Sequence, residues 1–170
     1  MEITRLGPSD MEDSLTELSS LLIDAVEDGA SVGFLLPLSR EAATAWWSTT
    51  LAEVDQGRLA VLVARDGGEI VGTVQLRLAA LPNGRHRAEV AKLLVRKAWR
   101  RRGTARALMT AIESVAREAG RSLLVLDTMQ GSTAEQMYRS LGWVEVGPIP
   151  DYAGWPDGTL GATVVFYKRL

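Results

Sequence analysis

The sequence predicts a single α/β domain built around a mixed β-sheet. The chain has 170 residues, of which 46% are hydrophobic and 24% charged, as expected for one globular domain. Short apolar runs bounded by turn residues alternate with segments of helical periodicity. The strands come first as a meander with tight turns and then as a strand–helix–strand unit. This order predicts antiparallel pairing early in the sheet and parallel pairing in its middle.

The N-terminal part of the chain predicts one short strand and two helices. Residues 1–6 fit a strand. A helix follows from about residue 9 to Gly29, because apolar side chains recur there at helical spacing. A loop over residues 30–37 leads to a second helix over residues 39–54, for which Ser39 is the cap.

The middle of the chain predicts a three-stranded meander. Residues 59–65 are predicted to form a buried strand, and Asp66-Gly67-Gly68 is a hairpin turn. Residues 69–79 return as the partner strand. After a second turn at Pro82-Asn83-Gly84, residues 87–95 form the third strand.

The C-terminal part alternates helix and strand. Apolar residues from Ala105 to Ala119 form one helical stripe, and Gly120 ends it. The remaining expected elements are a strand at 123–126, a helix at 133–141 and strands at 143–147 and 162–168. The complete order is β-α-α-β-β-β-α-β-α-β-β, with about four helices flanking the sheet.

Several function classes are excluded by residue usage. The chain has no cysteine, so it has no disulfide, no thiolate nucleophile and no cysteine metal site. A single histidine, His86, excludes a histidine-rich metal centre, and no metal is predicted. No apolar run reaches membrane-spanning length, and the N-terminus lacks the basic-then-apolar order of a signal peptide. We therefore expect a cytoplasmic protein that does not bind membranes.

Positive charge is concentrated in one short segment. The net charge is only −2, from 19 basic and 21 acidic residues. Six of the basic residues lie within residues 96–106, which contain no acid. The rest of the chain therefore has an excess of acids, and the segment 96–106 is suited to an anion.

The basic segment leads into a helix, which favours phosphate binding. The first backbone N–H groups of a helix have no intrahelical partner, and the helix dipole is positive there. Gly103 allows a ligand to approach the backbone, and the arginines offer planar donors that suit phosphate. The alternative is an ordinary solvated helix start. A Walker A loop and a G-x-G-x-x-G motif are both absent.

Two stretches of the sequence resemble motifs of a known family. Val95 followed by Arg100-x-x-Gly103-x-Ala105 at a helix start is similar to the acetyl-CoA motif of the GNAT superfamily of N-acetyltransferases. Residues 134–143, Ala-Glu-Gln-Met-Tyr-Arg-Ser-Leu-Gly-Trp, resemble the second hallmark of that family, and the element order matches over essentially the whole chain. Gly131 stands where the family often has asparagine.

A closer resemblance is to the tabtoxin-resistance acetyltransferases. It rests on dispersed stretches, namely residues 29–34, 82–84, 87–93, 126–128 and 156–158. It implies an enzyme that acetylates a small amino-acid-like β-lactam toxin or antibiotic. The partner would then be a small-molecule amine, and the chain could also form a homodimer.

The resemblance implies that acetyl-CoA is the cofactor and that its acetyl group passes directly to the amine, which fits the absence of cysteine. The pantetheine arm would lie along the strand end and a backbone N–H near Leu94 would stabilise the oxyanion. The implied cofactor-binding residues are Leu93, Leu94, Val95, Arg100, Arg101, Arg102, Gly103, Thr104, Ala105 and Arg106.

Glu89 and Asp127 are the candidate bases. Each is an acid in or beside an apolar strand, where burial would raise its pKa. The alternative is that Lys92 or an arginine pairs with them. Strict alternation puts Glu89 and Lys92 on opposite faces of the strand, and a bulge would change that.

Tyr138 occupies the family position for the acid that protonates the departing thiolate, and the alternative is a partly buried aromatic residue. His86 is an alternative base, although a histidine in a turn is more often exposed. Ser132 and Thr133 are expected to cap a helix.

The acceptor side has weaker signals. Of Trp46 and Trp47, one is expected in the core and one beside the substrate. We expect Phe34, Trp46, Tyr152 and Trp155 to bind the acceptor, the last two from a loop that can cover it. Asp24, Glu27 and Asp28 could attract a cationic amine or simply form a solvated acidic face.

Three other functions are compatible with the residues. A member of the family could instead acetylate a protein N-terminus, another amino acid or a polyamine. A non-catalytic CoA sensor is disfavoured by the presence of Glu89, Asp127 and Tyr138. A nucleic-acid binder is disfavoured because the sequence pI is about 5.5 and the basic residues form one loop.

Overall fold

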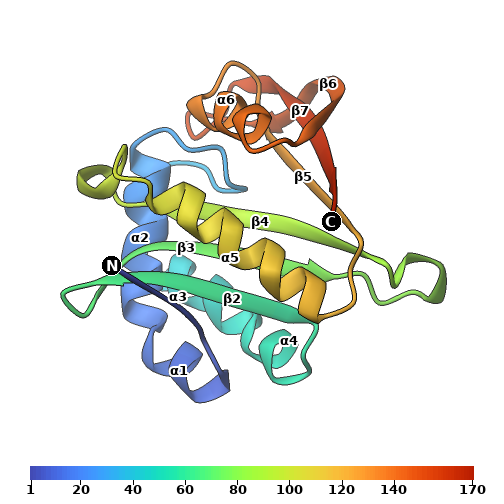
Figure 1. Cartoon of the computed structure of the whole chain (residues 1–170). Coiled ribbons are helices and arrows are strands. Elements are labelled where there is room, and N and C mark those ends of the chain that lie inside the picture. The colour runs from blue at the N-terminus through green and yellow to red at the C-terminus, as the bar shows by residue number, and fades with distance from the viewer.

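A computed structural model describes residues 1–170. Its seven strands form one sheet in the order β1-β2-β3-β4-β5-β7-β6. The strands are β1 (Glu2–Arg5), β2 (Leu59–Asp66), β3 (Glu69–Leu78), β4 (Arg87–Val95), β5 (Leu123–Met129), β6 (Val144–Gly154) and β7 (Leu160–Arg169). The helices are α1 (Pro8–Asp13), α2 (Leu15–Glu27), α3 (Arg40–Thr49), α4 (Leu51–Asp55), α5 (Thr104–Glu118) and α6 (Thr133–Ser140). Figure 1 shows the three strands β2–β4 running behind α5.

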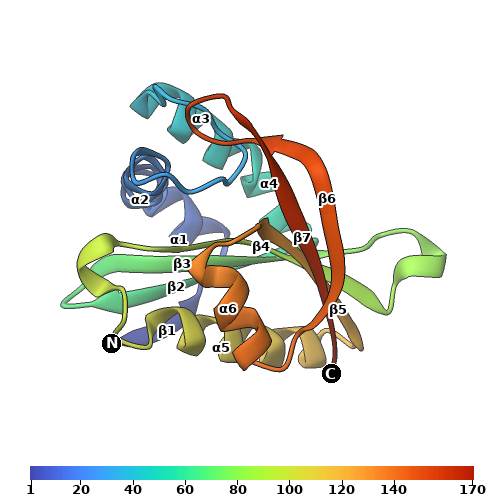
Figure 2. The ribbon, with the colours of Figure 1, turned by 90° about the horizontal axis from the view of Figure 1, so that it is seen from above.

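Helices cover both faces of the sheet. Figure 2 shows α5 and α6 on one side and α2, α3 and α4 on the other. One core lies on the α5 side and includes Leu108, Ile112 and Phe166. The other lies beneath α2 and α3 and includes Leu22 and Trp47, both completely buried. Two cores on one sheet are the arrangement expected of an α/β domain, so the predicted fold class is confirmed.

The pairing of the strands changes in the middle of the sheet, as the sequence predicted. Strands β1 to β4 pair antiparallel, and β4 pairs parallel with β5. The parallel ladder is short, since it joins only Arg87–Glu89 to Leu123–Val125. Beyond Glu89 the two strands separate, and the side of β4 that faces β5 has no partner strand. This opening determines where a ligand can meet the sheet.

A β-bulge interrupts β4 just beyond the opening. Thr73 pairs with Leu94, but Gln75 pairs with Ala91, so β4 has an extra residue between these pairs. Lys92 takes a left-handed conformation with φ of 51°. Ala88 and Val90 pack into the α5-side core before the bulge, whereas Leu94 packs into the other core after it. The bulge therefore reverses the alternation of side chains along β4.

The two predicted N-terminal helices are each broken into two. Ser14 separates α1 from α2, and Thr50 separates α3 from α4. The Thr50 hydroxyl donates to the carbonyl of Trp47 at 2.6 Å, and the Ser14 hydroxyl accepts from Arg65 at 3.2 Å. A hydroxyl that bonds a helical carbonyl, as the Thr50 hydroxyl does, competes with the helical backbone and bends it.

The last hairpin is longer than predicted. Strand β6 extends to Gly154, so Tyr152 lies in a strand rather than in a loop. Strand β5 extends to Met129, which places Asp127 inside the strand rather than after it. The tip of the β6–β7 hairpin contacts the segment after α2, because the backbone N–H of Leu36 donates to the carbonyl of Pro156 at 2.8 Å. No helix is both long and apolar enough to cross a membrane.

Candidate active site

A groove of about 580 Å³ runs along the open end of β4, the N-terminus of α5 and the start of α6. Every predicted cofactor-binding residue except Arg102 lines it. The sequence analysis missed its other side, which comes from Ala25, Ala30, Trp99 and, on α6, Thr133, Ala134 and Met137. Ala134 and Met137 belong to the second family hallmark at residues 134–143, but only the tertiary fold shows that this helix lines the same groove as the start of α5.

The N-terminus of α5 presents free backbone donors to this groove. Gly103 precedes the helix with φ of 85°, a conformation that favours glycine. The first intrahelical hydrogen bond runs from Ala107 N–H to the carbonyl of Gly103 at 3.0 Å. The N–H groups of Thr104, Ala105 and Arg106 are therefore unpaired, and the positive end of the helix dipole lies with them. This is the geometry that binds phosphate.

The six cations of the basic segment divide into two sets. Three pair with carboxylates, Arg96 with Asp24 and Glu69, and Lys97 and Arg100 with Asp28. The other three, Arg101, Arg102 and Arg106, are exposed and form no ion pair. The acids at the end of α2 therefore neutralise half of the basic segment, and Asp24 and Asp28 are not free to attract an amine. Arg102 instead lies over the Trp99 ring, 5.9 Å from its centre.

The end of β4 offers its backbone rather than its side chains. Leu94 is 2% exposed and belongs to the core under α2, while Leu93 and Val95 pack against the α5-side core. As predicted, these side chains are structural. The main chain of the same residues lies at the unpaired side of β4, where an extended ligand can bind as an added strand.

Glu89 and Asp127 lie on one face of the sheet. Glu89 pairs in register with Val125, two residues before Asp127 on β5. Both side chains are exposed and neither forms an ion pair. The expectation of burial is therefore wrong for both, because each points away from the core on which its strand packs. The alternative, an ion pair of either acid with Lys92 or an arginine, is not found.

Tyr138 is in the α5-side core. Its side chain is 6% exposed, with ring centres 6.0 Å from Trp143 and 6.1 Å from Phe166. Burial raises the pKa of the Tyr138 phenol, and the negative charge of Asp127 raises it further. The phenol therefore stays protonated over the physiological pH range, and its role as the acid stays a prediction.

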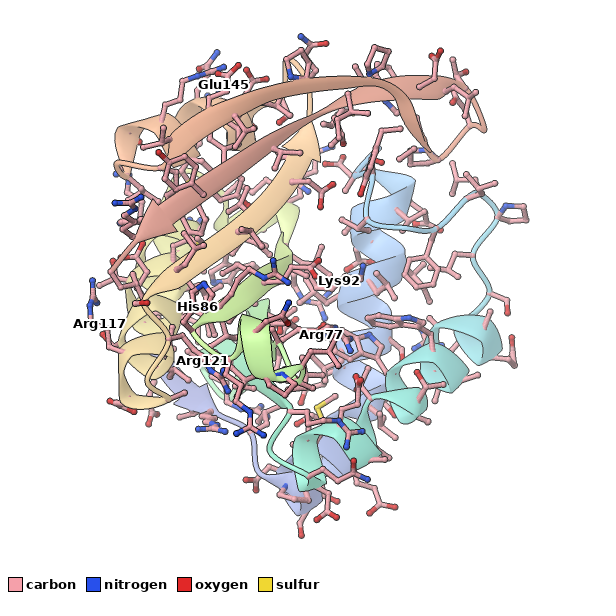
Figure 3. The ribbon with its side chains drawn as sticks, turned by 90° about the vertical axis from the view of Figure 1, so that its right-hand side faces the viewer. Arg77, His86, Lys92, Arg117, Arg121 and Glu145 are labelled. Atoms are coloured by element: carbon pink, nitrogen blue, oxygen red, sulfur yellow. The ribbon has the colours of Figure 1, made fainter.

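Lys92 is the residue that the sequence analysis did not select. The bulge turns it to the face of Glu89, and its ammonium group lies 5.2 Å from the Trp46 ring centre and 5.9 Å from that of Phe34. Burial lowers the pKa of Lys92, while Asp127 and Glu89 act against this shift. Figure 3 shows Lys92 between β4 and α2. The sequence feature that could have pointed to Lys92 is a lysine within an otherwise apolar strand end.

The four predicted acceptor residues are in different surroundings. Phe34 and Trp46 form an edge-to-face pair at 5.2 Å beneath Lys92. Trp47 is fully buried and is the core member of the two tryptophans, whereas the place of Trp46 beside the substrate stays a prediction. Tyr152 is 54% exposed, and the Trp155 ring packs on Gly161 in β7. The structure does not bring these last two to Lys92, and their roles stay predictions.

His86, Ser132 and Glu27 are the remaining residues named in the sequence analysis. His86 is exposed and precedes β4 at the end remote from Lys92, so nothing places it beside the groove. Ser132 caps α6 by accepting from the N–H of Glu135 at 3.2 Å. Glu27 is exposed, as a solvated acidic face requires.

Residues 23–143 match the model of the acetyltransferase (GNAT) family, a stretch that includes β4, the basic segment and α6. The chain belongs to the GNAT family. It is 30% identical over 152 residues to an uncharacterised N-acetyltransferase from the hisH–hisA intergenic region of Azospirillum brasilense, covering 84% of this chain and 89% of that one.

Solved structures share the same fold. The ribosomal-protein-alanine N-acetyltransferase of Brucella melitensis superposes with a TM-score of 0.79 at 22% identity, over 100% of both chains. The acetyltransferase yncA of Salmonella typhimurium, solved with acetyl-CoA, superposes with a TM-score of 0.78 at 18% identity, over 100% of this chain and 94% of that one. The family match and the relative from Azospirillum brasilense, rather than these shared folds, make the chain an acetyl-CoA-dependent N-acetyltransferase.

The groove fits acetyl-CoA in charge and shape. The free N–H groups of α5 together with Arg101 and Arg106 suit the pyrophosphate, and the unpaired side of β4 suits the amide groups of pantetheine. Bound acetyl-CoA supplies an activated acetyl group as a thioester. The chain must then accept a proton from the attacking amine, stabilise the oxyanion and provide a proton for the thiolate.

Proposed function

We propose that this GNAT enzyme acetylates the amine of a small amino-acid-like molecule, as a detoxifying enzyme of the tabtoxin-resistance type does. The observation that carries the proposal is that β4 and β5 separate beside two unpaired carboxylates, Glu89 and Asp127, on one face of the sheet. The bulge and the aromatic pair below it add a small polar and aromatic surface at the same place.

Each step of the transfer has a candidate residue in this arrangement. Glu89 or Asp127 removes the proton of the amine, directly or through a water molecule. The amine nitrogen then attacks the thioester carbon, and a backbone N–H near Leu94 stabilises the oxyanion. When the C–S bond breaks, Tyr138 gives its proton to the sulfur. No covalent enzyme intermediate is required.

The test is a thiol-release assay with acetyl-CoA and a panel of amines. The panel contains tabtoxinine-β-lactam, amino acids, polyamines, aminoglycosides and a peptide with a free N-terminus. We expect turnover of an amino-acid-like amine and little turnover of the peptide. Preferential turnover of the peptide or of a polyamine would reject the small amino-acid-like acceptor.

The roles of the carboxylates are tested with two isosteric variants. Glu89→Gln and Asp127→Asn remove the charge and keep the shape of each side chain. At least one variant should lower kcat on the order of 100-fold, because general base catalysis contributes that much or more. The Kd of acetyl-CoA should remain unchanged in both. Full turnover in both variants would show that neither carboxylate is the base.

A further inference from the structure

Lys92 combines two unfavourable features in one residue. Its left-handed φ of 51° is uncommon for any residue other than glycine and strains the backbone. Lys92 is half-buried, and burial without a partner is unfavourable for a charge. A regular strand would avoid both by pointing residue 92 into the α5-side core as an apolar side chain. The structure instead holds the ammonium group on the face of Glu89.

The donors of Lys92 have no acceptor in the chain. The ammonium group has three N–H donors, and none forms a hydrogen bond or an ion pair. The other two lysines, Lys97 and Lys168, each bind a carboxylate at 2.7 Å. The rings of Phe34 and Trp46 attract the cation but accept no strong hydrogen bond from it. Lys92 is therefore the one lysine whose ammonium group has no hydrogen-bond acceptor in the chain.

Carboxylates without a partner lie on the same face. Glu89 and Asp127 attract Lys92 electrostatically but do not pair with it. Arg77, labelled near Lys92 in Figure 3, is not available to them, because it binds Glu53 through both carboxylate oxygens at 2.6 and 2.7 Å. The face thus presents a free positive group and free negative groups that do not satisfy each other.

We propose that Lys92 binds the carboxylate of an amino-acid acceptor while Glu89 and Asp127 hold its amine. This inference rests on the proposed function and specifies its substrate class. In an α-amino acid the amine and the carboxylate are attached to one carbon atom, so a ligand of this kind brings both charges to the face at once. Its carboxylate gives Lys92 the acceptor that the chain does not supply, and Phe34 and Trp46 orient the lysine.

The experiment compares α-amino acids with their amides as acceptors. The amide keeps the amine and the side chain but lacks the negative charge. Since amide formation also lowers the pKa of the amine, the quantity to compare between enzyme variants is the ratio of kcat/KM for the acid to that for the amide. Lys92→Met replaces the ammonium group with an apolar group of similar length. The ratio should fall about tenfold or more, which is typical of a lost charged hydrogen bond.

Two further variants separate carboxylate binding by Lys92 from the general effect of removing a positive charge. Lys92→Arg keeps the charge and should retain most of the preference for the acid. Arg5→Met removes one exposed positive charge from β1, at the far edge of the sheet, and should leave the ratio unchanged. An unchanged ratio in Lys92→Met would overturn the inference while leaving the proposed function intact.

A binding measurement decides the inference if a variant fails to fold or if no amine is acetylated. In the wild-type complex with CoA, an α-amino acid should bind more tightly than its amide by calorimetry. Equal affinity of the two would overturn the inference. Absence of acetylation over the whole panel would reject the proposed function, and the calorimetric comparison would still test the role of Lys92.

Discussion

The guanidinium group of Arg100 forms an ion pair with Asp28. This pair joins the first residue of the Arg100-x-x-Gly103-x-Ala105 motif to the end of α2. Asp28 also binds Lys97 at 2.7 Å. One carboxylate therefore fixes two cations of the basic segment, whereas Arg101 and Arg106 line the groove without a carboxylate partner. The conformation of the loop before α5 thus depends on a residue more than 70 positions earlier in the chain.

Asp28→Asn should destabilise the protein in a pH-dependent way. Hydrogen bonds from Lys97 and then Arg100 hold the pKa of Asp28 below its ordinary value of 3.8. A lowered folded pKa stabilises the protein above pH 3.8, and this contribution is lost as the pH falls through the folded value. We expect a loss of about 1 kcal/mol at pH 7, since the pairs lie near the surface.

Urea unfolding of the wild type and of Asp28→Asn between pH 3 and pH 7 measures this effect. The difference in unfolding free energy should be constant at the upper end of that range and shrink at the lower end. A difference that is the same at every pH would show that the charge of Asp28 is not responsible. Asp151→Asn is a matched control, because Asp151 is exposed and forms no ion pair.

Arg101→Gln should weaken acetyl-CoA binding without changing the chemical step. Arg101 lines the groove and has no carboxylate partner, so its charge is available to phosphate. Loss of a charged hydrogen bond corresponds to roughly a tenfold rise in the Kd of acetyl-CoA. The salt dependence of binding should also decrease, while kcat at saturating cofactor is preserved. Arg5→Gln provides the comparison, and equal affinities in the two variants would exclude the role of Arg101.

The sequence predicted the parts of the site that depend on local pattern. The helix start at Gly103, the meander before it and the short parallel strand each have a signal within a few residues, and the structure confirms them. The ion pairs of Asp28 join distant segments, and no local pattern encodes them. The second hallmark at residues 134–143 is a local signal for α6, but it does not show that α6 meets α5 at the groove. The bulge at Lys92 is a departure from strict alternation, so a period-two reading of β4 cannot locate it.

Tyr138→Phe should lower kcat and leave stability nearly unchanged. The Tyr138 ring remains packed on Trp143 and Phe166 in the variant, and the hydroxyl forms no hydrogen bond within the chain. Because burial and then Asp127 raise the pKa of the phenol above its ordinary value of 10.0, the wild-type phenol stays protonated at that pH. If it protonates the thiolate, kcat should fall on the order of 100-fold with an unchanged Kd for acetyl-CoA. An undiminished kcat would assign Tyr138 to the core alone.

Gly161→Ala should displace Trp155 from the β6–β7 hairpin. A Cβ atom at position 161 would lie 2.0 Å from the Nε1 atom of Trp155, so the ring cannot stay where it is. Overpacking of this kind costs about 1 to 3 kcal/mol. Since the same hairpin tip contacts the segment that leads from α2 to α3 through Leu36 and Pro156, the KM of the amine should rise more than the KM of acetyl-CoA.

A double-mutant cycle with Trp155→Leu isolates this contact. If the ring causes the strain, Gly161→Ala should cost much less in the Trp155→Leu background, because the flexible leucine can move aside. Thermal unfolding of the four proteins gives the coupling free energy. Additive effects would place the cost in the backbone of β7 instead. Equal rises in the KM of the amine and the KM of acetyl-CoA in Gly161→Ala would show that the hairpin has no specific effect on the acceptor side. A general loss of structure affects both substrates, whereas a displaced hairpin affects the amine.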